Sequence, residues 1–279
     1  MTTDVAAAAS VEIKPDRGLF DLDLGAVWRY RELLIVLMMR DIQVLYKQAA
    51  LGVAWAILQP VFAVVIFTIV FGYFARMPSE GVPYPLFAFA GVLPWTYFAE
   101  AVRRAGTGLV NDSDLVRKVY FPRLIMPLAN VVTPLVDFCI AFLVLIAMMF
   151  FYGVMPSWKF LVVPPLMIVA AVLALSIGLW LGPINVRFRD IKHTLPFLIQ
   201  IWMYASPIVY PLSMVPQEWR WAYALNPMVG VIEGFRWAVF DRGDPDFGAL
   251  GISAIVIAVL LFGGLLFFRR MERSFADLI

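Results

Sequence analysis

Charged residues, histidine and cysteine are all scarce in this chain. Only 15% of its 279 residues are charged, whereas a soluble domain carries about 25%. The one cysteine, Cys139, cannot form an intramolecular disulfide and has no Cys or His neighbours at metal-ligand spacing. The one histidine, His193, nearly excludes His-based metal sites and catalytic triads. We therefore expect neither a metal nor another cofactor.

The phosphate-binding loop of ATPases is also missing. Its pattern, G-x-x-x-x-G-K-[ST], requires a Gly-Lys pair, and the sequence contains none. The chain is therefore not expected to hydrolyse ATP by itself, nor to be an enzyme. Its formal net charge of +2 is too small to suggest nucleic acid as a partner.

What the sequence has in excess is apolar residues, at 62% of positions with a mean hydropathy of +0.85. A bilayer core about 30 Å thick needs about 20 mostly apolar residues in a helix. Six such runs occur, at residues 51–75, 84–102, 124–152, 160–186, 195–216 and 247–268. This pattern predicts an all-α polytopic membrane protein with six transmembrane helices. Pro127 and Pro134 are expected to place the start of the third run at the interface or to kink it.

The basic residues predict the orientation of these spans. Seventeen of the 22 Lys and Arg residues lie in the amino-terminal segment, the second and fourth connections and the carboxyl tail. Because cytoplasmic loops carry the excess of basic residues, both termini are expected in the cytoplasm. Residues 1–23 are polar and Ala-rich, which predicts a disordered cytoplasmic tail, and residues 271–279 form the second tail.

Two further segments also have a pattern. In residues 24–50, apolar residues recur at three- and four-residue steps among charges, which predicts an amphipathic helix in the cytoplasmic interface. The alternative is a lead-in that only anchors the first span. Between Trp202 and Phe240, nine aromatic residues alternate with prolines. Short re-entrant helices in the outer leaflet, before the last span, fit this pattern best.

Four stretches, in order, resemble one family of membrane proteins. They are Arg40-Asp41-Ile42-Gln43-Val44-Leu45-Tyr46-Lys47-Gln48 with Leu51-Gly52, Trp55 and Gln59-Pro60; Tyr120-Phe121-Pro122-Arg123 with Pro127; Asn185-Val186-Arg187-Phe188-Arg189-Asp190; and Asn226-Pro227 with Glu233 and Arg236. The chain resembles the type-2 ABC transporter permeases, especially those that export O-antigen, capsule and teichoic-acid polysaccharides. The resemblance implies a homodimer in the bacterial inner membrane, two copies of a separate ABC ATPase subunit, and a lipid-linked polysaccharide substrate.

The connection between the second and third spans is the candidate ATPase-coupling site. Asn111, Asp112 and Ser113 can cap a helix, and Asp114 lies four residues before Lys118, a favourable spacing for an ion pair. The resemblance places the coupling helix of the family here, whereas an ordinary basic loop is the alternative. The candidate residues are Asp112, Asp114, Leu115, Arg117, Lys118 and Tyr120.

Aromatic residues of the outer connection are the candidate polymer contacts. Their rings offer apolar faces to sugars and polar edges to hydroxyl groups, although Trp and Tyr also mark membrane interfaces in general. The candidates are Tyr204, Tyr210, Trp219, Trp221 and Trp237.

Asp137 is an acid within an apolar span, and such residues are usually functional. Thr133 or a polar group on another helix is its expected partner, and the alternative role is to hold the bundle together by a hydrogen bond.

Three functions fit the sequence to different degrees. Export of a lipid-linked polysaccharide explains the aromatic outer connection best. A drug or small-lipid exporter of the same superfamily is the second possibility. A membrane-embedded transferase is a remote third, because it needs paired carboxylates or a His base in a cytoplasmic cleft, and the acids here form no pair.

Overall fold

The computed structural model describes residues 24–47, 54–242, 247–272 and 275, and every regular element in these ranges is helical. The elements are α1 (Leu24–Arg29), α2 (Arg31–Lys47), α3 (Ala54–Phe67), η1 (Thr68–Phe74), α4 (Tyr84–Asn111), α5 (Ser113–Lys118), α6 (Ile125–Val132), α7 (Leu135–Phe151), η2 (Trp158–Val162), α8 (Val163–Arg187), α9 (Ile191–Tyr204), η3 (Leu212–Met214), α10 (Gln217–Ala224), α11 (Pro227–Phe240) and α12 (Phe247–Glu272). The predicted all-α class is confirmed. The predicted tail at 1–23 lies outside the described residues, as do 273–274 and 276–279 of the second tail.

Five segments of the described chain are long and apolar enough to cross a membrane. They are Ile57–Phe74, Tyr84–Asn111, Ile125–Phe151, Trp158–Arg187 and Gly248–Glu272. Each coincides with a predicted run, so five of the six runs are confirmed as helical segments of spanning length. The second extends to Asn111, past the predicted end at residue 102. Glu100 accepts hydrogen bonds from Arg103 and Arg104 at distances down to 2.6 Å, so these charges pair along the helix and do not end it.

The predicted run at residues 195–216 is only partly helical. Helix α9 ends at Tyr204 after 14 residues, which correspond to about 21 Å at 1.5 Å per residue. This length is shorter than a bilayer core of about 30 Å. Pro207 and Pro211 follow, and proline cannot continue a helix without losing a backbone hydrogen bond. Helices α10 and α11 then form in the connection predicted to hold short helices.

The predicted irregularity of the third span is confirmed at one of its two prolines. Pro127 lies within α6, whereas α6 and α7 are separated at Thr133 and Pro134. Thr133 Oγ1 donates a hydrogen bond to the Ala129 carbonyl at the break. The same carbonyl also accepts the Thr133 N–H at 3.0 Å, and a Ser or Thr hydroxyl bound to the i−4 carbonyl often accompanies a bend in a helix.

Helix α4 forms the centre of the bundle. In its most apolar stretch 78% of the residues are buried, against 11% for the first span and 17% for the last. Helix α8 packs closely on α4, because a side chain at Gly178 would lie 2.4 Å from the Ala105 Cβ. Small residues allow such close approach between membrane helices. The outer surfaces of the first and last spans are therefore open to lipid or to another protein chain.

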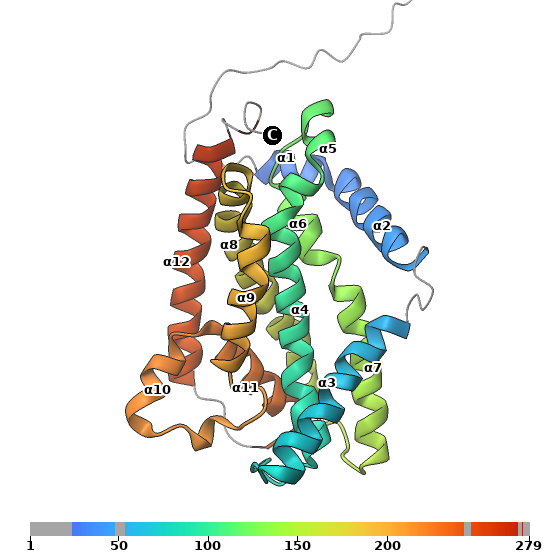
Figure 1. The fold of residues 1–279 in the computed structure, drawn as a ribbon, viewed down its shortest axis with the longest axis vertical. Coiled ribbons are helices and arrows are strands. Elements are labelled where there is room, and N and C mark those ends of the chain that lie inside the picture. The colour runs from blue at the N-terminus through green and yellow to red at the C-terminus, as the bar shows by residue number, and fades with distance from the viewer. Residues whose placement is uncertain (1–23, 48–53, 243–246, 273–274, 276–279) are drawn as a thin grey trace, which may run out of the picture.

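The bundle has two distinct ends. One carries α1, α2, α5 and the carboxyl end of α12, and the opposite end carries α10 (Figure 1). We refer to them as the α5 end and the α10 end. The predicted interfacial segment is helical as α1 and α2 up to Lys47, and residues 48–50 of that prediction lie outside the described residues. Helix α2 slopes outward from the α5 end along one side of the bundle (Figure 1) and packs on α6.

Candidate functional site

The candidate coupling segment is a short helix, α5, with one buried and one exposed face. Val116 is 7% exposed and packs in a cluster of buried residues at the α5 end, which we call the α5 cluster. Its members are Leu37, Leu109, Val116, Phe121, Ile125, Met126, Ala129, Leu179, Val186, Phe268 and Phe275. Leu115 is partly buried against it. The cluster therefore fixes α5 to α2, α4, α6, α8 and α12.

The other predicted coupling residues form the exposed face of α5 and the turn after it. Asp114, Arg117 and Lys118 are exposed, and Tyr120 is 78% exposed. The predicted pair of Asp114 and Lys118 is present at 3.7 Å. Both side chains are largely in solvent, so this pair adds little stability. The structure therefore presents a helical, charged surface at the α5 end and not an irregular loop.

Asp112 binds another helix and does not cap α5 with its side chain. It stands at the N-cap position, but its carboxylate makes no capping hydrogen bond, so the prediction of a side-chain cap is wrong. Instead, Arg40 of α2 donates a hydrogen bond to Asp112 at 2.9 Å and binds the neighbouring Asp41 at 2.8 Å. Burial raises the pKa of the Asp112 carboxyl, the nearby Arg40 opposes this shift, and the charge of Asp41 adds to it. Arg40 thus ties α2 to the start of α5.

Asp137 makes a second link to α2. It lies in the first turn of α7, and its carboxylate accepts a hydrogen bond from the Tyr46 hydroxyl. The predicted partner on another helix is therefore Tyr46, because the Thr133 hydroxyl binds Ala129 instead. Burial and this hydrogen bond raise the pKa of the Tyr46 phenol. Helix α2 is fixed at Arg40 to the α4–α5 junction and at Tyr46 to α7.

The predicted polymer-contact residues divide into two groups in space. Tyr210 and Trp219 line one open hollow of about 410 Å³, where the Tyr210 and Tyr223 hydroxyls lie 2.9 Å apart. The Tyr210 hydroxyl also donates to the Tyr204 carbonyl at 3.3 Å.

The other two candidates lie apart from this hollow. Trp237 is partly buried, and the Lys159 ammonium lies 4.8 Å from its ring. Trp221 is 64% exposed on α10. Of the five candidates, only Tyr210 and Trp219 line this hollow. Tyr204 is joined to them through its carbonyl, which binds Tyr210, and it lines a smaller neighbouring pocket with Tyr210. Trp221 and Trp237 line neither of these two pockets.

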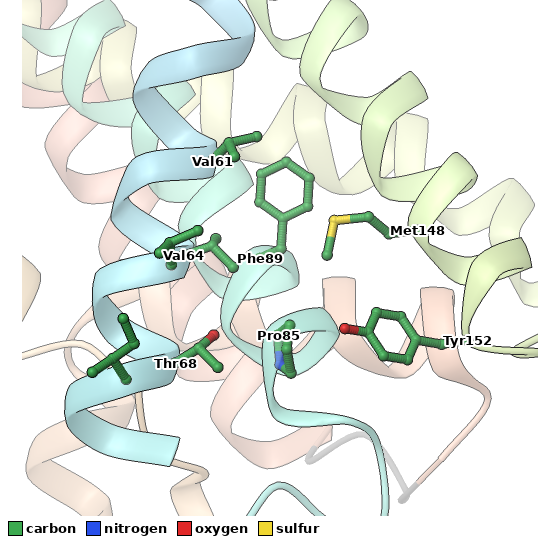
Figure 2. A pocket seen from close by; sticks show the side chains of 9 residues that line it. Val61, Val64, Thr68, Pro85, Phe89, Met148 and Tyr152 are labelled. Atoms are coloured by element: carbon green, nitrogen blue, oxygen red, sulfur yellow. The ribbon is translucent and has the colours of Figure 1, made fainter. Parts of the chain in front are cut away.

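A second cavity lies between α3, η1, α4 and α7. It has a volume of about 290 Å³, and its lining is mostly apolar, including Val61, Val64, Phe89 and Met148. Figure 2 shows the Tyr152 hydroxyl and the Thr68 side chain directed into this space near Pro85. None of the predicted polymer-contact residues lines it. Apolar walls of this kind do not match a glycan that is rich in hydroxyl groups.

Comparison with known proteins decides the family. The family model described as "ABC-2 type transporter" matches residues 32–240, which include α5, both anchor points of α2 and the outer connection. The chain belongs to the ABC-2 type transporter family. This confirms the resemblance seen in the sequence motifs.

Three relatives are similar to this ABC-2 family member over most of their length. An O-antigen export system permease protein RfbA from Myxococcus xanthus is 30% identical over 91% of this chain and 97% of the relative. One of the same name from Klebsiella pneumoniae is 28% identical over 89% of this chain and 95% of the relative. The polysialic acid transport protein KpsM from Escherichia coli is 26% identical over 85% of this chain and 93% of the relative.

Asn226 and Arg236 hold the outer connection of this ABC-2 family member in place, whereas the sequence placed them only within a family stretch and predicted no role for them. Asn226 accepts hydrogen bonds from Trp202 Nε1 at 2.8 Å and from the Met228 N–H at 3.1 Å, and it donates to Ser206 Oγ at 3.0 Å. It therefore caps α11 and binds the end of α9. The only sequence signal was the Asn-Pro pair, which is typical of a capped helix start.

Arg236 does the same for the non-helical backbone after α9. Its guanidinium is buried, donates to the Pro207 and Ile208 carbonyls at 2.7 and 2.6 Å, and lies 3.7 Å from the centre of the Phe87 ring. Glu233 accepts a further bond from it at 2.9 Å. Irregular backbone inside a membrane requires partners for its carbonyls, and Arg236 provides them here.

Proposed function

We propose that this chain is the permease subunit of an ABC exporter that moves a lipid-linked polysaccharide of O-antigen, capsule or teichoic-acid type across the bacterial inner membrane. A separate ABC ATPase subunit hydrolyses the ATP. The observation that carries the proposal is the match to an O-antigen export permease over 91% of this chain and 97% of the relative. A likeness over this much of both chains supports the same role for the coupling segment and the outer connection.

The proposed assembly is a homodimer with two ATPase subunits and six membrane crossings per permease. Five crossings are the long helices, and α9 with the non-helical stretch and α11 makes the sixth. An even number of crossings agrees with the presence of the α2 segment and the end of α12 at one end of the bundle (Figure 1) and with the unequal distribution of basic residues. The poorly buried first span, at 11%, leaves an apolar face for the second permease.

In this proposal the ATPase binds the exposed face of α5, formed by Asp114, Arg117, Lys118 and Tyr120. Movement of α5 reaches α4 through the chain itself. It reaches α2 through the Asp112–Arg40 ion pair, and α2 carries it to α7 through Tyr46 and Asp137. Asp137 is then a link in the coupling path, and it does not contact the transported molecule.

The polymer passes the aromatic residues of the outer connection in this proposal. Tyr204, Tyr210, Trp219, Trp221 and Trp237 stay its candidate contacts, and the hollow beside Tyr210 and Trp219 is the best-formed part of that surface. Each ring contributes about 1 kcal/mol by stacking. Several weak contacts allow a chain to slide, whereas a few strong ones would hold it.

The test is deletion of the gene in its own host, with the chain restored from a plasmid. We expect the deletion strain to lose its surface polysaccharide and to accumulate the lipid-linked polymer on the cytoplasmic face of the inner membrane. The restored strain should export it again. Normal surface polysaccharide together with greater sensitivity to drugs would instead identify the small-molecule exporter.

A further inference from the structure

The carboxyl end of the last span is attached to the turn that follows α5. Arg123 lies between α5 and α6, and its Nη1 donates a hydrogen bond to the Glu272 carbonyl at 2.6 Å. The same guanidinium lies 5.6 Å from the centre of the Phe275 ring, within the range of a cation–π contact. One side chain therefore binds both the last residue of α12 and a residue just after it.

Phe275 is itself a buried part of the α5 cluster. Its side chain is 0% exposed, although the residue follows the last span. Its ring stands edge-on to Phe268 of α12, with 5.6 Å between the ring centres. The cluster also contains Val116 of α5 and Phe121 of the turn. A buried aromatic ring is among the strongest single apolar contributions in a protein. Through this ring, the segment after α12 belongs to the same apolar cluster as α5 and its turn.

We propose that Arg123 and Phe275 form a latch that makes α5, α6 and the cytoplasmic end of α12 move as one unit when the ATPase acts on α5. The latch rests on the proposed coupling role of α5. Helices α4 and α8 already give α5 an indirect route to the last span, because α4 packs on α8 and α8 packs on α12. The latch adds a direct attachment to that route. Neither Arg123 nor Phe275 belongs to the proposed ATPase face or polymer surface, so both act by positioning.

The latch gives α5 a route to the outer connection. Helix α12 packs against α10 and α11 toward the other end of the bundle. The side chain of Leu250 on α12 lies 3.1 Å from where a Cβ at Gly230 of α11 would be. A shift of α12 therefore acts directly on the helices that carry the candidate polymer contacts. The α5 end and the α10 end are in this way joined by a single rigid helix.

Two truncated chains that differ by one residue test the latch. A chain that stops after Phe275 keeps the latch, and one that stops after Ser274 lacks only the ring. Each is purified with its ATPase in lipid nanodiscs and in proteoliposomes, and polymer export and ATP hydrolysis are measured at equal protein. We expect the chain ending at Phe275 to match the full chain. The chain ending at Ser274 should bind the ATPase equally well, but the amount of polymer that it exports per ATP hydrolysed should fall by about fivefold or more.

The ratio of export to hydrolysis separates coupling from stability. If losing Phe275 only weakens the fold, protein level, hydrolysis and export fall together and the ratio stays constant, which would overturn the latch. An equal ratio in both truncated chains at normal protein level overturns it as well. Restoring a ring with Phe275→Tyr in the full chain should keep the ratio normal, whereas Phe275→Ala should reproduce the defect.

A cross-link tests whether the latch stays closed. Leu124 and Leu265 line the same small cavity of about 50 Å³ beside Arg123. Replacing both with cysteine in a Cys139→Ser background allows a short thiol cross-linker to join the start of α6 to α12. If these segments move as one unit, export should continue after cross-linking. Loss of export would show that α6 and α12 separate in each transport cycle. Val116→Pro distinguishes the two proposals. Normal export by the Val116→Pro variant contradicts the coupling role of α5 itself. If that variant fails to export but the chain that stops after Ser274 exports normally, only the latch is contradicted.

Discussion

The hydrogen bond from Tyr46 to Asp137 links α2 to α7, the second part of the third long segment. We predict that Tyr46→Phe releases the end of α2 from α7 without altering the rest of the bundle. The substitution removes one oxygen and keeps the ring, so packing changes little. Asp137 loses the hydrogen bond seen in the structure.

The size of the effect follows from the type of bond. A hydrogen bond to a charged group contributes about 1.5–3 kcal/mol in proteins. Both side chains are part-exposed here, and water replaces part of the lost bond, so we expect a loss at or just below this lower limit, about 1–1.5 kcal/mol. Each 1.4 kcal/mol corresponds to about a tenfold change in an equilibrium constant. Local opening of α2 should therefore become about 5- to 13-fold more frequent.

Amide hydrogen exchange in lipid nanodiscs, read by mass spectrometry, measures this opening. Peptides covering residues 41–47 should exchange faster in Tyr46→Phe, and peptides from α4 and α8 should not change. Tyr30→Phe is the matched control, because Tyr30 lies on the same interfacial segment and its side chain is exposed. The control should leave exchange in α2 as it is in the natural chain.

A double-mutant cycle with Asp137→Leu then isolates the pair. Tyr46→Phe should have little effect once Asp137 is Leu, because the acceptor is gone. If the two changes instead add to within about 0.3–0.5 kcal/mol, the residues are independent. In that case this pair does not connect α2 to α7, and the coupling path proposed through Tyr46 and Asp137 is wrong.

Three further predictions concern the coupling helix, the aromatic surface and the topology. Val116→Pro should destabilise α5 by about 3 kcal/mol or more and abolish export while the protein still inserts into the membrane. ATPase co-purification and export assays check this, and normal export would show that α5 is not needed. Trp219→Ala or Tyr210→Ala should each slow export at matched expression by about 1 kcal/mol, and the pair should compound; reduced abundance with normal export per molecule would make them membrane anchors. In a Cys139→Ser chain, a cysteine that replaces Glu218 should react with an impermeant reagent added outside intact cells, and a cysteine that replaces Ser113 should not. Labelling at position 113 would show that the proposed orientation is wrong.

The places where prediction and structure differ have physical causes. The span at residues 195–216 looked continuous because its residues are apolar, but its prolines end α9 at Tyr204, and the buried Arg236 then satisfies the backbone carbonyls that follow. A hydropathy count does not register either effect. The cap predicted for Asp112 failed because Arg40, distant in sequence, binds the same carboxylate. A charged donor forms a stronger hydrogen bond than a backbone N–H.

The sequence by itself determined the membrane class, the positions of five long helices, the family resemblance and the short helix between the second and third spans. These features depend on properties that run along one chain segment: apolar length against bilayer thickness, proline positions and local charge spacing. Only the tertiary structure decided which polar groups meet. Tyr46 reaches Asp137 and Arg123 reaches Glu272, although 91 and 149 residues separate them in the chain. Such pairs arise because packed helices must bury their few polar groups against one another, and the sequence names the groups without saying which helices lie side by side.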